Sequence, residues 1–150
     1  MSDQQWGWSE QLAVKYEPMD ATHREFVTLC AALSDTGAND YLARLDAMIA
    51  HSIEHFEQEN RWMDAFDFPP AGCHVREHNT VLGVLRDVRE RVAGGDAELG
   101  ARLAEELPQW FEHHVANMDT ALAEFLQRKG YDGTALPLAA QDADTATLAL

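Results

Sequence analysis

The sequence predicts an all-α protein, an up-down-up-down antiparallel four-helix bundle with an extended N-terminal arm. Apolar residues recur at spacings of three and four along four segments, the pattern of helices with one buried face. Short turn-like segments join these stretches, so consecutive helices should pack antiparallel. The 150 residues, 46% of them apolar, are enough for one domain with one core. We expect the bundle over residues 1–130 and an acidic C-terminal tail over residues 131–150.

The arm and the first helix open the chain. Residues 1–18 contain Trp6, Trp8 and Tyr16 without a sustained period, so we expect an extended arm whose aromatic rings lie across the bundle. Asp20 has the short acceptor side chain of a helix N-cap, and we expect the first helix to begin there. Its buried stripe consists of Met19, His23, Phe26, Cys30 and Leu33. The histidine in this stripe needs a polar partner in the core.

A turn over residues 34–40 leads to two helices that are joined by a second, proline-containing turn. The second helix is expected over residues 41–66 and the third over about residues 73–92, where two glycines follow. The inward stripe of the second helix is Leu45, Met48, Ser52, His55, Glu59, Trp62 and Met63. The third helix carries its histidines at the head of an apolar stripe. Both helices therefore direct polar groups into an apolar interior.

The fourth helix is expected over residues 97–129 and contains a proline. Pro108 cannot donate to the helical hydrogen-bond ladder, so we expect a kink or a break at Leu107. The inner face beyond that point consists of Trp110 or Phe111, His114, Met118, Leu122 and Phe125. Residues 131–150 show no clear period and are expected to be mobile or draped on the bundle.

Two histidine-containing pairs lie on the helices that flank the proline turn. Residues four apart on an α-helix sit about 40° from each other, so His55 shares a face with Glu59 and His74 with His78. Antiparallel packing aims both pairs into one interior. A lone buried histidine is usually only hydrogen-bonded, but two such pairs on adjacent apolar faces indicate a metal.

Polar groups predicted to face inward come from all four helices. They are His23, His55, Glu59, His74, His78, one of His113 and His114, and Asp119. Asp119 lies five residues beyond His114, which is about 140° around a regular helix. A single π-turn would bring the two side chains to one face, and we predict one near residues 116–119, with a bent helix as the second option.

The donor set indicates two metals rather than one. Structural zinc takes four ligands and prefers thiolates, whereas both cysteines lie outside the set. Imidazole with carboxylate suits iron, and a bundle core can hold two bridged irons. If Glu59, Asp119 and a solvent-derived oxygen bridge the two irons, three of the histidines complete the coordination of one iron. His23 and His55 leave one position open on the other iron, where a small molecule would bind.

The arrangement of these residues resembles that of the hemerythrins, in particular the bacterial single-domain form. The family pattern is a histidine on the first helix, His-x-x-x-Glu on the second, His-x-x-x-His on the third and His-x-x-x-x-Asp on the fourth. The matching residues are His23, His55, Glu59, His74, His78, His114 and Asp119. The resemblance spans about residues 8–125 and selects His114 over His113.

The resemblance implies reversible dioxygen binding at the open iron, in a protein that carries, stores or locally supplies oxygen. Two electrons would pass to dioxygen from the di-iron(II) pair. Five imidazoles with two carboxylates should stabilise iron(II), unlike the carboxylate-rich sites of oxygen-activating enzymes. An apolar pocket is expected to exclude water from the open iron, and its lining is Phe26, Trp62, Trp110 and Phe111.

The sequence departs from the family pattern at three positions. Members often carry glutamine in place of Thr22, glutamate in place of Asn60 and a smaller aliphatic residue in place of Phe111.

Three functions other than an oxygen carrier are compatible with the sequence. One alternative is an enzyme on the same site, such as a peroxidase, a nitric oxide reductase or a ferroxidase, acting on peroxide, nitric oxide or iron. Another is an oxygen- or iron-sensing module. The third is a bundle whose histidines bind zinc or are structural.

Composition weighs against several other classes. The net charge of −15 opposes binding to nucleic acid or to anionic membranes. No apolar run is long enough for a membrane span, and the N-terminus lacks signal-peptide features, so a cytoplasmic protein is expected. Cys30 and Cys73 are too few for a disulfide framework and are expected to be buried thiols. His51 and His113 are expected to be ordinary helix residues near the site.

Overall fold

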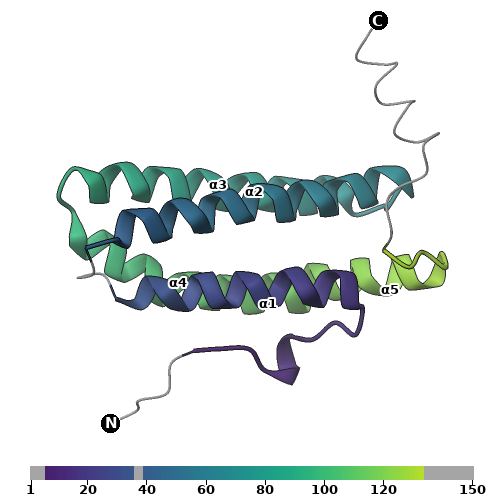
Figure 1. Ribbon diagram of the computed structural model, residues 1–150. Coiled ribbons are helices and arrows are strands. Elements are labelled where there is room, and N and C mark those ends of the chain that lie inside the picture. Colours follow the sequence, from purple (N-terminus) through teal and green to yellow (C-terminus); the bar gives the residue numbers. More distant parts are fainter. Residues whose placement is uncertain (1–5, 36–38, 134–150) are drawn as a thin grey trace, which may run out of the picture.

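Antiparallel helices make up the described part of the chain. The computed structural model describes residues 6–35 and 39–133, and every regular element in these ranges is helical. The elements are η1 (Glu10–Leu12), α1 (Glu17–Ala31), η2 (Ala32–Ser34), α2 (Tyr41–Ala65), α3 (Ala71–Ala93), α4 (Ala97–His114), η3 (Val115–Asp119) and α5 (Thr120–Arg128). In Figure 1, α1 lies beside α4 and α2 beside α3, and each helix runs against the one before it. The predicted all-α, up-down-up-down bundle is confirmed. Beyond residue 133, the expected tail falls outside the described residues.

The fourth helix of the bundle contains the irregular turn that the sequence predicts. The element η3 (Val115–Asp119) is a π-turn, and α5 continues directly from it. A π-turn near residues 116–119 is therefore confirmed. The turn keeps α4 and α5 in one continuous helix while it changes the angular position of every residue that follows.

The proline of the fourth helix does not interrupt it. Pro108 lies inside α4, which runs without a break from Ala97 to His114, so the predicted break at Leu107 does not occur. A proline removes only one backbone hydrogen bond from the ladder. Leu107 and Phe111 are both buried, and their packing holds the helix together around this point.

The first helix begins earlier than the sequence indicates. It starts at Glu17 with Pro18 in the first turn, where a missing backbone N–H costs no hydrogen bond. Asp20 therefore lies inside α1, and the prediction that it is the N-cap is wrong. Its buried carboxylate instead accepts a hydrogen bond of 2.8 Å from the backbone N–H of Val14. Asp20 thus ties the N-terminal arm to the first helix.

The N-terminal arm lies along the bundle. In Figure 1, residues 6–16 run past α1 on the outside of the helices. Trp6 donates through Nε1 to a carboxylate oxygen of Glu112 at 3.0 Å. Tyr16 donates through its hydroxyl to the backbone carbonyl of Tyr131 at 2.9 Å. The aromatic contacts predicted for the arm are therefore present in its described part.

The described interior is apolar except for a layer of histidines and carboxylates and the buried side chains of Asp20 and Ser52. The stripes predicted for α1 and α2 are buried, from Met19 to Leu33 and from Leu45 to Met63. Cys30 is buried as predicted, but the prediction of a buried Cys73 is wrong because that thiol is exposed. Cys73 precedes the inward-facing His74 by one residue, which turns its side chain about 100° away.

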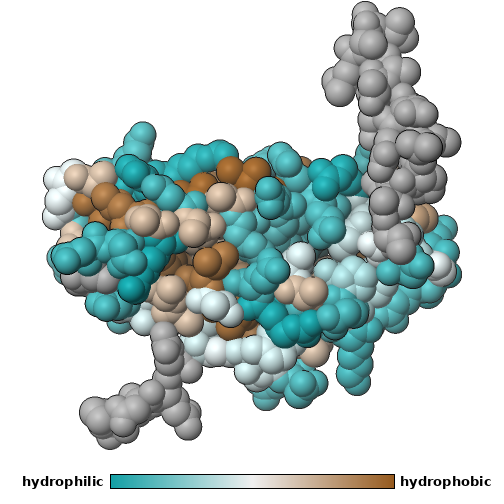
Figure 2. All heavy atoms as spheres, viewed as in Figure 1, coloured by the Kyte–Doolittle hydropathy of each residue, from teal (hydrophilic) through white to brown (hydrophobic). Residues whose placement is uncertain are grey.

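The surface is largely polar. On the face shown in Figure 2, hydrophilic side chains predominate over the middle of the bundle, and hydrophobic ones gather near the end where α1 leads into α2. Among the described residues, no helix combines the length and the apolar character needed to cross a lipid bilayer. The histidines and carboxylates of the core are buried beneath this largely polar surface.

Candidate metal centre

Five of the predicted ligands converge in the core, and we call them the three-histidine group. They are Glu59, His74, His78, His114 and Asp119, each with a ligand atom within 4.8 Å of the others. Oδ1 of Asp119 lies 3.1 Å from Nε2 of His74 and 3.2 Å from Nε2 of His114. Oε1 of Glu59 lies 3.2 Å from Nε2 of His78. Three imidazoles therefore face one oxygen from each carboxylate.

His23, His55 and Glu59 form an adjoining cluster, which we call the two-histidine group. Oε2 of Glu59 lies 2.9 Å from Nε2 of His55 and 3.4 Å from Nε2 of His23. Oδ2 of Asp119 lies 3.2 Å from the same nitrogen of His23. Each carboxylate thus directs one oxygen to each group, which is the arrangement in which two cations can share both carboxylates.

Helix geometry places these side chains. The pairs four residues apart on α2 and α3 each share one face, and α1 contributes His23 from its buried stripe. His114 is the last residue of α4 and Asp119 the last of the π-turn, and the wider turn brings the two to one face. His113 is exposed and His51 belongs to neither group. The structure therefore brings together all seven predicted ligands.

The donor set fits a pair of metal ions. None of the seven side chains is more than 2% exposed. Among the described residues, several of their atoms have no hydrogen-bond partner: both ring nitrogens of His23 and His74, Nδ1 of His55, Oε1 of Glu59 and both carboxylate oxygens of Asp119. Buried polar atoms without partners are costly, and metal coordination would satisfy them. Imidazole and carboxylate together suit iron.

Electrostatic coupling within the centre is strong. Burial opposes a charge on His23, but the neighbouring carboxylates of Asp119 and Glu59 favour it and raise its pKa to about 10. The same two carboxylates, acting against burial, raise the pKa of His74 to about 9. Burial would raise the pKa of Glu59, but the surrounding imidazoles, above all His55, hold it well below its ordinary value. Metal ligation needs neutral imidazole, so metal binding must release these protons.

Side chains outside the ligand set orient two of the histidines. Nδ1 of His114 lies 3.0 Å from Oε1 of Glu77, and Nδ1 of His78 lies 3.0 Å from Oδ1 of Asn60. A donor role for each Nδ1 leaves Nε2 free to face the centre. Phe56 stacks on the His78 ring with centroids 4.1 Å apart. Sequence reasoning missed Glu77, because its partner lies on another helix and no local spacing indicates it.

The four predicted pocket aromatics do not share one location. Phe111 meets the His23 ring edge-on at 5.2 Å and stacks on Phe26 at 4.2 Å, so both lie at the two-histidine group. Trp110 stacks on His114 at 4.7 Å, in the three-histidine group. The ring contacts of Trp62 among the described residues are with Tyr16 and Tyr131 rather than with a histidine of the centre.

Known proteins of one family are similar to this chain. The family model described as "Hemerythrin HHE cation binding domain" matches residues 14–126. A bacteriohemerythrin of Ralstonia nicotianae is 47% identical over 125 residues, which cover 83% of this chain and 91% of that protein. One from Aquifex aeolicus is 27% identical over 72% of this chain and 87% of its own. One from Methylococcus capsulatus is 25% identical over 67% of this chain and 79% of its own.

Proposed function

The chain belongs to the hemerythrin family and is a non-haem di-iron protein that binds dioxygen, and on this premise we propose which residues hold the iron. Glu59 and Asp119 bridge the two irons, together with one solvent-derived oxygen. The remaining ligands of one iron are His74, His78 and His114, which fill its coordination. Those of the other are His23 and His55, which leave one position open for dioxygen.

The division of carboxylate oxygens carries this proposal. Glu59 presents Oε1 to the three-histidine group and Oε2 to the two-histidine group. Asp119 likewise presents Oδ1 to the three-histidine group and Oδ2 to the two-histidine group. A site for a single ion would need only one oxygen from each carboxylate. The unequal number of imidazoles supports one filled and one open coordination sphere.

The proposed dioxygen position is enclosed by aromatic side chains. Phe26 and Phe111 are fully buried and lie against His23 and His55. Bound iron supplies the electrons and the coordination position for dioxygen. The role of the two rings is to exclude water from that position and so to slow irreversible oxidation. We propose reversible binding, for storage or local delivery of oxygen, as the function of this pocket.

An optical experiment tests this function. The purified chain is reduced without oxygen, its iron is counted, and its spectrum is recorded before exposure to air, after it, and after renewed removal of oxygen. We expect about two irons per chain and a visible charge-transfer band that disappears when oxygen is removed. Irreversible conversion to di-iron(III) would contradict a carrier and favour an enzyme or a sensor. A chain without iron would contradict the proposed ligands.

A further inference from the structure

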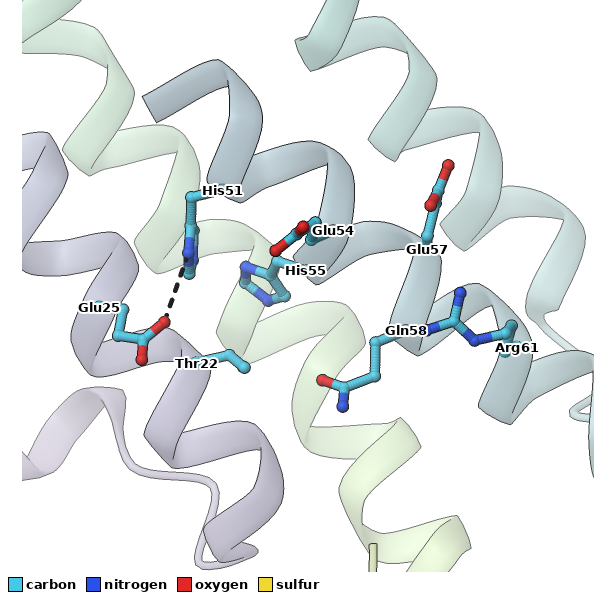
Figure 3. Close-up of a pocket in the computed structure, with 8 residues that line it drawn as sticks. All are labelled: Thr22, Glu25, His51, Glu54, His55, Glu57, Gln58 and Arg61. Carbon is cyan, nitrogen blue, oxygen red and sulfur yellow. Dashed lines mark ion pairs between the residues drawn. The ribbon is translucent and has the colours of Figure 1, made fainter. Parts of the chain in front are cut away.

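A polar cavity opens to the solvent beside the two-histidine group. Its volume is about 460 Å³, and it lies between α1 and α2. Figure 3 shows Glu25 on α1 facing His51 on α2, with His55 one turn further along α2. Neither Phe26 nor Phe111, the aromatic residues of the proposed dioxygen pocket, lines this cavity.

One residue of the centre lines the cavity. His55 lines it, although only 1% of the His55 side chain is exposed. Nδ1 of His55 has no hydrogen-bond partner among the described residues, whereas Nε2 lies 2.9 Å from Glu59. One imidazole therefore forms part of the cavity wall and also contacts a carboxylate of the two-histidine group.

The charge of the cavity favours a cation. Glu25, Glu54 and Glu57 line it, and Arg61 provides one opposing charge. All three carboxylates are exposed, so they can collect ions from solvent. A cleft lined by charges of one sign concentrates counter-ions and speeds their capture about 10- to 1000-fold. Dioxygen is neutral and apolar, and it would gain nothing from such a lining.

The chemistry beside the centre favours a transition metal. Nδ1 of His51 lies 3.5 Å from Oε2 of Glu25, so a nitrogen donor stands next to a carboxylate. Magnesium and calcium prefer oxygen ligands alone, whereas iron(II) accepts both. The ring centroids of His51 and His55 are 5.4 Å apart, so an ion bound at His51 would move only a short distance to reach His55. Six waters need roughly 180 Å³, so a hydrated ion fits the cavity.

We propose that this cavity is the loading route for the centre: hydrated iron(II) is captured by Glu25, Glu54 and Glu57, passes His51, and reaches the two-histidine group at His55. The inference rests on the proposed di-iron function. It assigns to His51 and three surface carboxylates a role in iron uptake that is separate from holding iron in the finished centre.

Kinetics of iron uptake test the route. The iron-free chain is mixed with limiting iron(II) under argon, a chelator stops the reaction at set times, and the iron bound per chain is counted. We compare the unaltered chain with E25Q/E54Q/E57Q and with His51→Gln. The matched control, E90Q/E105Q/E124Q, removes the same charge at exposed glutamates that do not line the cavity.

We expect the cavity triple variant to load about tenfold more slowly than the control, with the same final iron content. His51→Gln should also slow loading. Added salt should slow the unaltered chain and leave the cavity triple variant nearly unaffected. Equal loading rates, or a lower final iron content in the variants, would overturn the route and leave the di-iron assignment intact. Failure of the unaltered chain to take up iron would overturn both.

Discussion

Oδ1 of Asp119 lies 3.2 Å from Nε2 of His114, although five residues separate the two along the chain. A regular α-helix would place them about 140° apart. The π-turn over Val115–Asp119 closes that gap, and Oδ2 of the same carboxylate reaches His23 on α1. The irregular turn is therefore what allows one side chain of the fourth helix to contact both halves of the centre.

Removal of one ligand from the two-histidine group should lower the iron content without emptying the three-histidine group. We expect His23→Ala to lower the bound iron by about half, because the three-histidine group keeps all of its donors. Iron counting on the purified variant measures this. The matched control is His113→Ala, which removes an exposed imidazole next to a ligand and should leave the iron content unchanged. Full iron occupancy in His23→Ala would contradict the assignment of His23.

Glu77 should strengthen the three-histidine group through His114. Its carboxylate accepts a hydrogen bond at 3.0 Å, which increases the basicity of the imidazole. We expect Glu77→Ala to weaken iron binding about tenfold and Glu77→Gln, which keeps an acceptor, to weaken it less. Competition with a chelator at equilibrium measures both. If Glu77→Ala binds iron no more weakly than the exposed-site variant Glu105→Gln, the hydrogen bond has no such effect.

Phe111 should protect the open coordination position. It is fully buried between Phe26 and His23, and a smaller side chain would admit water. We expect Phe111→Leu to speed irreversible oxidation several-fold and to cost about 1–2 kcal/mol of stability. The decay of the oxygen-dependent band gives the oxidation rate. Phe125→Leu, at a half-buried ring that packs on Phe68 rather than on His23, should leave that rate unchanged.

Asp20 should hold the N-terminal arm on the bundle. Its carboxylate is buried and accepts the Val14 N–H at 2.8 Å, and hydrogen bonds to charged groups contribute about 1.5–3 kcal/mol. We expect Asp20→Ala to lower the free energy of unfolding by about 2 kcal/mol and Asp20→Asn, which keeps an acceptor, by less. Denaturant unfolding measures both. Equal stability of Asp20→Ala and the unaltered chain would show that this bond is not needed.

The iron-free chain should lose stability as the pH rises above neutrality. The pKa of His23 rises from 6.5 to about 10 and that of His74 from 6.5 to about 9 on folding, so protonation of these residues stabilises the folded state. That stabilisation is complete below pH 6.5 and disappears as the pH passes 9 and then 10. The lowered pKa of Glu59 gives folding stability the opposite pH dependence. Its contribution to stability is present at neutral pH and is lost only as the pH falls below about 4.5.

Thermal unfolding at several pH values measures this effect. Between pH 6 and pH 10 we expect the midpoint of the iron-free chain to fall by at least about 4 °C, the equivalent of roughly 1 kcal/mol. The iron-loaded chain is the control, because its ligand imidazoles are already neutral and should lose no protons over that range. A midpoint that falls equally in both forms would mean that other groups cause the change.

Helical periodicity made most of the fold and the centre predictable. The i,i+4 spacing is a local property of one helix, so the pairs on α2 and α3 could be placed without a structure. The five-residue step from His114 to Asp119 conflicts with that spacing, and this conflict indicated the π-turn. Two local rules failed: Pro108 does not break α4, and Asp20 is not a cap, because packing and the position of Pro18 override them.

The sequence by itself determined that the seven side chains of the centre face the interior, since backbone geometry sets the direction of each residue on a helix. Only the tertiary structure decided which of these side chains contact one another. It shows which oxygen of Glu59 lies near which histidine, and that Glu77 contacts His114. It also decided that Phe111 borders His23, whereas the ring of Trp62 packs on Tyr16. The physical reason is that such contacts depend on the rotation and spacing of neighbouring helices, which the periodicity of a single helix does not encode.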